Sequence, residues 1–179
     1  DDGAYTRSAN TLHVSWSASD PESGIAGYEY AIGTTPAGSE VIAWTPVGLD
    51  TQVTRSGLSL QNGMTYYVSV KAVNGAGLTS TGSSNGIRVA SPVTSIGGVK
   101  SLPDGVFVWL ENKYATVASG LFSGLIYIQE SDRTAGIAVS PSSGSVAPGH
   151  LADVAGVMSG AGGERVVIFG EVTDRGSAQ

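Results

Sequence analysis

The chain has 179 residues, of which 41% are hydrophobic and 13% charged, and 26 are Gly. This hydrophobic content is enough for globular cores, so extensive disorder is excluded. A formal net charge of −6 disfavours generic electrostatic binding to nucleic acid. The absence of Cys excludes disulfides and thiolate chemistry. Apolar runs such as "VFVWL" are too short for a membrane span.

Short stretches of alternating residues, separated by Gly, Pro and Ser, predict an all-β chain without sustained helical periodicity. Ser91-Pro92 interrupts the strand-like "GIRVA", and the pattern restarts at "VTSIGG". We therefore predict two β domains, residues 1–91 and 92–179. The opening "DDGAY" and the ending "DRGSAQ" are typical of a segment cut from a longer polypeptide, so we expect neighbouring domains of a parent protein as partners.

The first half alternates clearly between apolar and polar residues. "TLHVSWSA" places Leu12, Val14 and Trp16 on one face, and "GMTYYVSVKAV" places Tyr66, Val68, Val70 and Ala72 on one face, the last three as expected core residues. About seven strands of this kind, with one Trp near the start, predict a β-sandwich.

The pattern L-x-V-x-W followed by "GLSLQNGMTYYVSVKAVNGAG" resembles a fibronectin type III domain over about residues 4–90. Leu60 followed by Tyr66 is similar to that family's tyrosine corner. The resemblance implies that the Tyr66 phenol bonds the preceding corner, that Trp16 is a core residue, and that Tyr67 faces outward. "SWSASDPESGIAGYEYAIGTTP" resembles modules of bacterial secreted multidomain proteins, which implies an extracellular or cell-surface location.

The turn "SDPESG" offers two interpretations. Asp20 and Glu22 could contribute carboxylate ligands to a Ca²⁺ site. Alternatively, Asp20 caps the turn and both carboxylates are solvated, which is the usual arrangement in a Pro-containing turn. We therefore expect no metal site here.

The second half contains a long strand in "LPDGVFVWLENKYATVAS" and two hairpins, in "GLIYIQESDRTAGIAVSP" and in "VAPGHLADVAGVMSGAGGERVVIFGEV". Five strands close most economically as a small barrel, because closure removes the sheet edges. The order of "LPDG", "YIQE", "GIAV" and "GER" resembles OB-fold modules of bacterial exported proteins over about residues 96–173. Two departures stand out: His150 replaces an acidic residue after "PG", and no helix signal separates the hairpins.

Aromatic residues predicted to point outward are the candidate ligand-binding residues. They are Phe107, Trp109 and Tyr127 of the predicted barrel and Trp44 of the first half. Three interpretations remain open: packing against another domain, stacking on a polysaccharide, or stacking on single-stranded nucleic acid. The last follows from OB-fold analogy alone. It is the least favoured, because the second half has five basic and eight acidic residues.

Catalytic constellations are absent from the sequence. His13 and His150 fall in different predicted domains, which argues against a Ser-His-Asp arrangement. "SGAGG" lacks the Lys-Ser/Thr of a phosphate loop, and Glu130 and Asp132 lie in a predicted loop. We therefore predict a protein that is not an enzyme and needs no cofactor. It is expected to be an accessory or spacer pair that mediates domain presentation and contacts with proteins or glycans.

Overall fold

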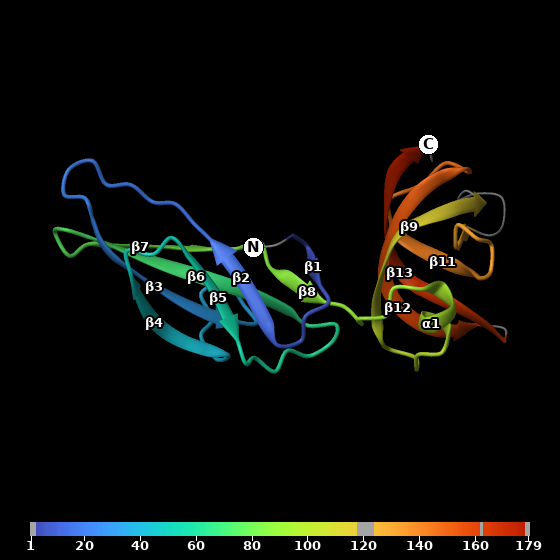
Figure 1. The fold of residues 1–179 in the computed structure, drawn as a ribbon, viewed down its shortest axis with the longest axis horizontal. Coiled ribbons are helices and arrows are strands. Elements are labelled where there is room, and N and C mark those ends of the chain that lie inside the picture. Colours follow the sequence, from blue (N-terminus) through green and yellow to red (C-terminus); the bar gives the residue numbers. More distant parts are fainter. Residues whose placement is uncertain (1–2, 118–123, 162, 178–179) are drawn as a thin grey trace. The chain divides into compact units, whose positions relative to one another are not determined.

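The structure is a computed structural model that describes residues 3–117, 124–161 and 163–177 (Figure 1). The chain divides into two compact units, Asp1–Val89 and Ala90–Gln179. The division falls two residues before the position that the sequence indicates. Both units consist of strands, with one short helix among the described residues, and the all-β prediction is confirmed.

The first unit contains two sheets of unequal size. The larger has the order β1-β8-β6-β3-β4, with β7 also pairing with β6, and the smaller consists of β2 and β5. β1 runs parallel to β8 and the other pairs are antiparallel. The strand bounds are β1 Tyr5–Thr6, β2 Thr11–Ser15, β3 Ile25–Gly33, β4 Ile42–Gly48, β5 Gln52–Ser56, β6 Thr65–Asn74, β7 Thr79–Ser83 and β8 Ile87–Val89.

Alternating residues of these strands fill the interior between the two sheets. In β2, Leu12 and Val14 are buried while their neighbours are more exposed. The same alternation buries Tyr66 and Val68 at the start of β6. The cluster is completed by residues from β3, β8 and the segment before β6: Tyr30, Ile32, Leu58, Leu60, Ile87 and Val89. The first unit is therefore a β-sandwich, as the period-two pattern predicts.

Tyr66 fastens the corner that precedes β6. Its hydroxyl accepts a hydrogen bond from the backbone N–H of Gln61 at 3.0 Å. Leu60, next to this corner, is buried in the core. At the far end of β6, the Asn74 side-chain oxygen accepts hydrogen bonds from the backbone N–H groups of Ala76 and Leu78, which closes the turn into β7.

Trp16 follows β2 and lies at the margin of the core. It packs against the buried cluster but is only half-buried. Its ring meets Tyr28 edge to face, with centroids 5.8 Å apart and planes inclined by 68°. This is a favoured aromatic geometry. Trp16 therefore has the structural contacts that the sequence suggests, with part of its surface exposed.

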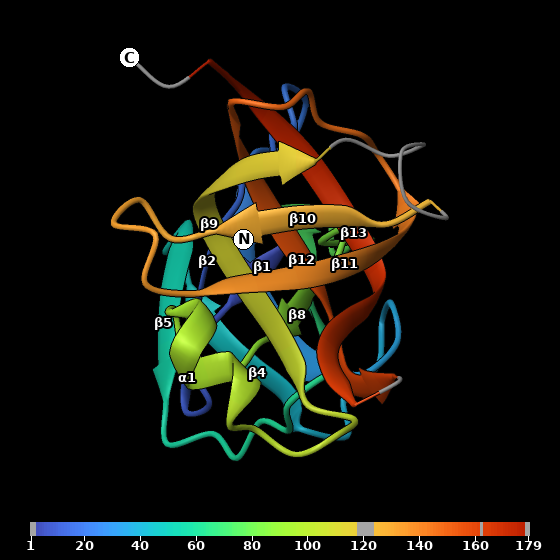
Figure 2. The ribbon, with the colours of Figure 1, turned by 90° about the vertical axis from the view of Figure 1, so that its right-hand side faces the viewer.

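The second unit is a closed sheet of five strands, in which the pairs follow the order β10-β11-β13-β12-β9 and back to β10. Figure 2 shows these strands curving around a common interior, with α1 at one end. β11 and β13 are parallel and the other pairs antiparallel. The bounds are α1 Ile96–Lys100, β9 Phe107–Val117, β10 Ile126–Gln129, β11 Gly136–Ser143, β12 His150–Ala161 and β13 Glu164–Ser177.

α1 closes part of the interior of the second unit. Ile96 and Val99 of this helix are fully buried in the same cluster as residues from the strands. Ser95 caps the helix, because its side chain accepts a hydrogen bond from Gly98 N at 3.1 Å. The sequence does not predict this helix, since "IGGVK" is short and carries two residues of poor helix propensity.

We expect Tyr66→Phe to destabilise the first unit by about 1 kcal/mol, because the Gln61 N–H loses its protein acceptor while the ring remains packed. Urea unfolding followed by the amide NMR signals of β6 measures the effect. Tyr67→Phe, one position along the same strand, is the matched control and should unfold like the unmodified chain. Equal stability of both variants would contradict the role of the corner bond.

Candidate functional site

Trp44 of β4 already has a partner over one face of its ring. The Lys71 ammonium of β6 lies 4.4 Å from the centre of the indole. Lys71 also forms an ion pair with Glu29 of β3 at 2.8 Å. A cation over the ring is attracted to the aromatic face and occupies the position that a stacked sugar would need. The contact between Trp44 and Lys71 therefore stabilises the pairing of side chains on this face of the sheet.

The three aromatic residues of the second unit do not form one platform. Tyr127 of β10 pairs with Val117 of β9, whereas Trp109 lies eight positions earlier in β9 and pairs with Ala155 of β12. A strand rises about 3.3 Å per residue. Trp109 is therefore near the start of β9, whereas Tyr127 lies beside the end of β9. Both are half-buried.

Phe107 was expected to be an exposed ligand-binding residue. It is only 2% exposed, so its ring is not available to a ligand. The ring is not part of the interior cluster. However, the backbone N–H of Ser91 donates to the Phe107 carbonyl at 2.9 Å, so the segment that leads into α1 runs beside the start of β9. Alternation of strand residues indicates which face a side chain is on, but not what covers that face.

Tyr127 lines a hollow of about 310 Å³ on the second unit. Residues of β11 and two cationic side chains, Lys100 and Arg165, also line it. Lys100 donates to the Gly136 carbonyl at 3.2 Å, and Arg165 is paired with Asp104 and bonds the Leu102 carbonyl. The complete lining is Lys100, Tyr127, Gly136, Ile137, Ala138, Gly163, Glu164 and Arg165.

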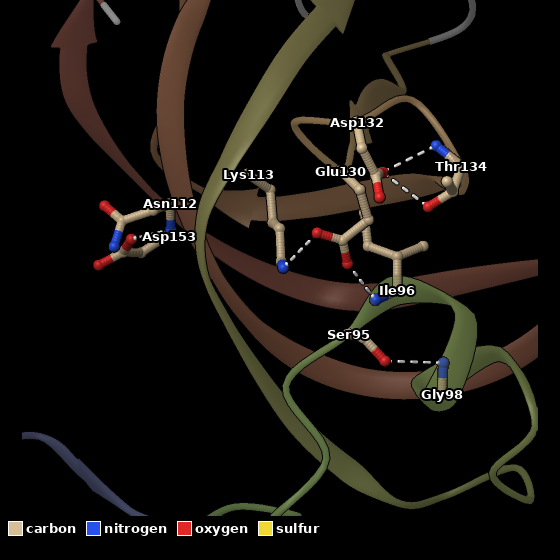
Figure 3. A network of polar contacts seen from close by, with 9 residues as sticks. All are labelled: Ser95, Ile96, Gly98, Asn112, Lys113, Glu130, Asp132, Thr134 and Asp153. Atoms are coloured by element: carbon tan, nitrogen blue, oxygen red, sulfur yellow. Dashed lines mark hydrogen bonds and ion pairs between the residues drawn. The ribbon is translucent and has the colours of Figure 1, made fainter.

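Glu130, at the end of β10, connects three elements of the second unit (Figure 3). One carboxylate oxygen accepts from Lys113 of β9 at 2.7 Å, and the other accepts from the backbone N–H of Ile96 at 2.6 Å. The side chains of Lys113 and Glu130 are only 12% and 18% exposed. A well-shielded ion pair that also satisfies the first amide of a helix holds α1 against the sheet.

Asp132 shapes the turn between β10 and β11 (Figure 3). It accepts hydrogen bonds from the Thr134 hydroxyl at 2.7 Å and from the Thr134 N–H at 3.0 Å. These bonds, with a smaller contribution from the charge of Lys113, lower the pKa of Asp132 below its ordinary value. The carboxylate is therefore kept ionised and committed to the turn.

Asp153 of β12 is almost completely buried, at 6% exposure. Arg175 of β13 binds it through Nε at 2.7 Å and through a second guanidinium nitrogen. The backbone N–H of Asn112 donates to the other carboxylate oxygen at 2.9 Å. Asn112 has φ 52° where the pairing of β9 and β12 shifts register, so Asp153 holds the bulge that bends β9.

His150 and Asp174 form a pair across β12 and β13. The imidazole Nδ1 lies 2.9 Å from both oxygens of Asp174. The backbone N–H of Gly176 and then the His150 side chain lower the pKa of Asp174. His150, the departure from the expected acidic residue, therefore pairs with an acidic residue on the neighbouring strand.

The carboxylate of Asp20 is occupied by hydrogen bonds within the protein. One oxygen accepts from the N–H groups of Glu22 and Ser23, and the other accepts from the Asn74 side chain at 2.7 Å. These bonds, led by that from Ser23 N–H, lower the pKa of Asp20. Within the ranges that the structure describes, no group of three or more His, Cys, Asp or Glu residues is placed to hold a metal ion.

Both units are β domains. The carboxylates described above bind turns, a bulge and a helix of the protein itself. Residues 4–87 match the family model of the fibronectin type III domain. The first unit is therefore a fibronectin type III sandwich. The comparison with curated proteins gave no match to the chain, and neither did the comparison with solved structures.

The residues that form the polar network of the second unit are not predicted from the sequence pattern. Glu130 and Asp132 were noted only as loop carboxylates, and Lys113, Asp153 and Arg175 were not singled out. A signal for Asp153 was present, since it is an acidic residue within the apolar run "HLADVAGVM". Charged residues are rarely buried without a partner, so such a position predicts an ion pair even when its partner is unknown.

We expect Glu130→Gln to destabilise the second unit by about 2 kcal/mol, because a charge-assisted bond to Ile96 becomes neutral and Lys113 loses its counterion. Guanidinium unfolding followed by amide NMR signals of β9 and β12 measures the change. Glu164→Gln, at an exposed position of β13, is the control for loss of one negative charge. An effect of the same size in both variants would refute the bridging role of Glu130.

Proposed function

We propose that the chain is a non-catalytic accessory pair of a larger extracellular bacterial protein, in which its two units space and present neighbouring domains. The observation that supports this function most directly is the fibronectin type III match over residues 4–87. The engagement of carboxylates such as Glu130 and Asp153 in structural bonds agrees with it. In the described part of the chain, no helix has the length and apolar character needed to cross a membrane.

The second unit fits an OB-fold module within this proposal. Its five strands form a closed sheet in which non-consecutive strands are neighbours, β11 beside β13 and β9 beside β12. A five-stranded Greek-key barrel is the architecture of OB-folds. The polar bonds of Glu130 and Asp153 stabilise this arrangement. A spacer domain needs such a stable shape, because its function is to hold its neighbours in place.

A spacer keeps the domains on its two sides at a defined separation. With the 179-residue chain inserted between two fluorescent proteins, we expect energy transfer to report a narrow distance distribution that neither salt nor EDTA changes. The control is a Gly/Ser linker of equal length, whose ends sample a broad distribution. A distribution as broad as that of the linker would rule out the spacer function.

Glycan binding is a second candidate, and the hollow beside Tyr127 favours it. This site combines an aromatic side chain, residues of β11 and the basic residues Lys100 and Arg165. Sugar sites use an aromatic face for stacking and a few polar groups for orientation. Nucleic-acid binding is less favoured, because Arg165 is paired with Asp104 and the whole chain is acidic.

Pull-down with insoluble polysaccharides distinguishes the glycan candidate from the spacer alone. We expect Tyr127→Ala to weaken retention about tenfold, which corresponds to ~1.4 kcal/mol. Trp109→Ala and Trp44→Ala remove aromatic residues that do not line the hollow and should leave retention unchanged. Absence of binding by the unmodified chain would exclude glycan binding, and loss only in Trp109→Ala would exclude the Tyr127 hollow.

A further inference from the structure

The sandwich of the first unit is incomplete beside β7. The smaller sheet has two strands, β2 and β5, whereas the larger sheet extends through β6 to β7. Every residue of β7 is exposed. Ser80 and Gly82 stand opposite Ala72 and Val70 of β6, so they share the face that is turned toward the interior. The inner face of β7 therefore has no layer packed on it.

A groove lies where this layer is missing. A hollow of about 380 Å³ is bounded by the end of β2 and by the inner faces of β6 and β7. A second hollow of about 300 Å³ shares Ala18, Ala72 and Ser80 with the first and continues to Leu78, which is 70% exposed. The lining of the first hollow is Val14, Ser15, Trp16, Ser17, Ala18, Tyr28, Val68, Val70, Ala72 and Ser80–Ser84.

The backbone of β2 has an open edge along this groove. Within the described ranges, β2 pairs only with β5. Trp16 N donates to the Thr51 carbonyl at 2.9 Å, which places its N–H on the β5 side. Backbone groups alternate between the two edges of a strand, so the N–H groups of Ser15 and Ser17 point away from β5. Such an edge is a template for a further strand.

Trp16, a residue that lines the groove, carries an unsatisfied donor. The indole nitrogen of Trp16 is buried and has no hydrogen-bond partner among the described residues. Buried polar groups of folded proteins nearly always have a partner, so an isolated donor of this kind indicates that an acceptor is supplied from elsewhere. A backbone carbonyl of a strand added beside β2 is an acceptor of suitable chemistry.

We propose that this groove binds an extended polypeptide strand without acidic residues, which adds to the open edge of β2 and covers the inner face of β7. Main-chain hydrogen bonds supply affinity in this mode, and pockets for alternate side chains supply selectivity. The lining carries a single acidic residue, Asp20, at the Leu78 end. Charge complementarity therefore selects a strand that has no acidic residue and has a basic residue at that end.

A peptide of about seven residues that alternates Val and Thr and ends in Lys is the probe, because it has high strand propensity and one basic end. Titrated into the full chain, it should bind saturably and slow amide hydrogen exchange at Ser15 and Ser17 about tenfold. A peptide alternating Pro and Thr lacks half of the backbone donors and should not bind. Equal binding of the two peptides, or no saturable binding, overturns the proposal.

Gly82→Glu places a charge on the inner face of β7 and should weaken binding of the Val/Thr peptide about tenfold or more. A Cβ at Gly82 meets no atom within 4 Å, so the sandwich accommodates this change. Thr54→Glu, on the exposed part of β5, is the matched control and should bind normally. Ser15→Pro removes an edge donor instead, and provides an independent variant with the same expected loss.

Other occupants give different outcomes. If the chain dimerises in sedimentation experiments and peptide binding requires dissociation of the dimer, the edge belongs to a second copy and the proposal is wrong. A cello-oligosaccharide is the second test ligand. If it slows exchange at Ser15 and Ser17, and if Gly82→Glu weakens its binding, the groove is a sugar site and the proposal is also wrong. Neither result affects the spacer experiment, which does not depend on this groove.

Discussion

The hydrogen-bonding requirement of strand edges organises both units. An edge strand presents unpaired N–H and C=O groups, which are stable only in water or against a partner. The second unit removes the problem by closing its five strands into one continuous sheet. In the first unit, β1, β2, β4, β5 and β7 each have one strand neighbour among the described residues. The closed sheet suits a rigid spacer, and the open edge can accept another chain.

Closing five strands forces sharp bends, and the charged residues of the second unit are placed where these bends occur. β9 pairs with β12 from Phe107 to Tyr114 and with β10 from Tyr114 to Val117, and Asn112 lies where the register with β12 shifts. Asp153 binds the amide at that bulge and is neutralised by Arg175. Glu130 similarly anchors α1 from the end of β10. Carboxylates that are this well satisfied contribute to a defined geometry, because removal of one partner would leave a buried group unpaired.

The sequence predicted those features that depend on alternation within a strand. Leu12, Val14 and Val68 are buried as their spacing indicates, and the five strands of the second half were correctly counted. Features that depend on neighbouring strands could not be predicted this way. The separation of Trp109 from Tyr127 results from the register of β9 against two different partners. The burial of Phe107 is not given by its position in the alternating pattern of β9.

The open side of the sandwich follows from composition as well as topology. The inner positions of β7 are Ser80 and Gly82, which bury too little apolar surface to attract a covering layer from within the unit. Trp16 and Tyr28 instead seal the core at this margin through their edge-to-face contact. The core cluster therefore remains intact without a strand over β7. Ser80 and Gly82 are small residues that do not fill the groove. They also leave room for the side chains of an added strand, so the same residues that make the sandwich incomplete make the edge accessible.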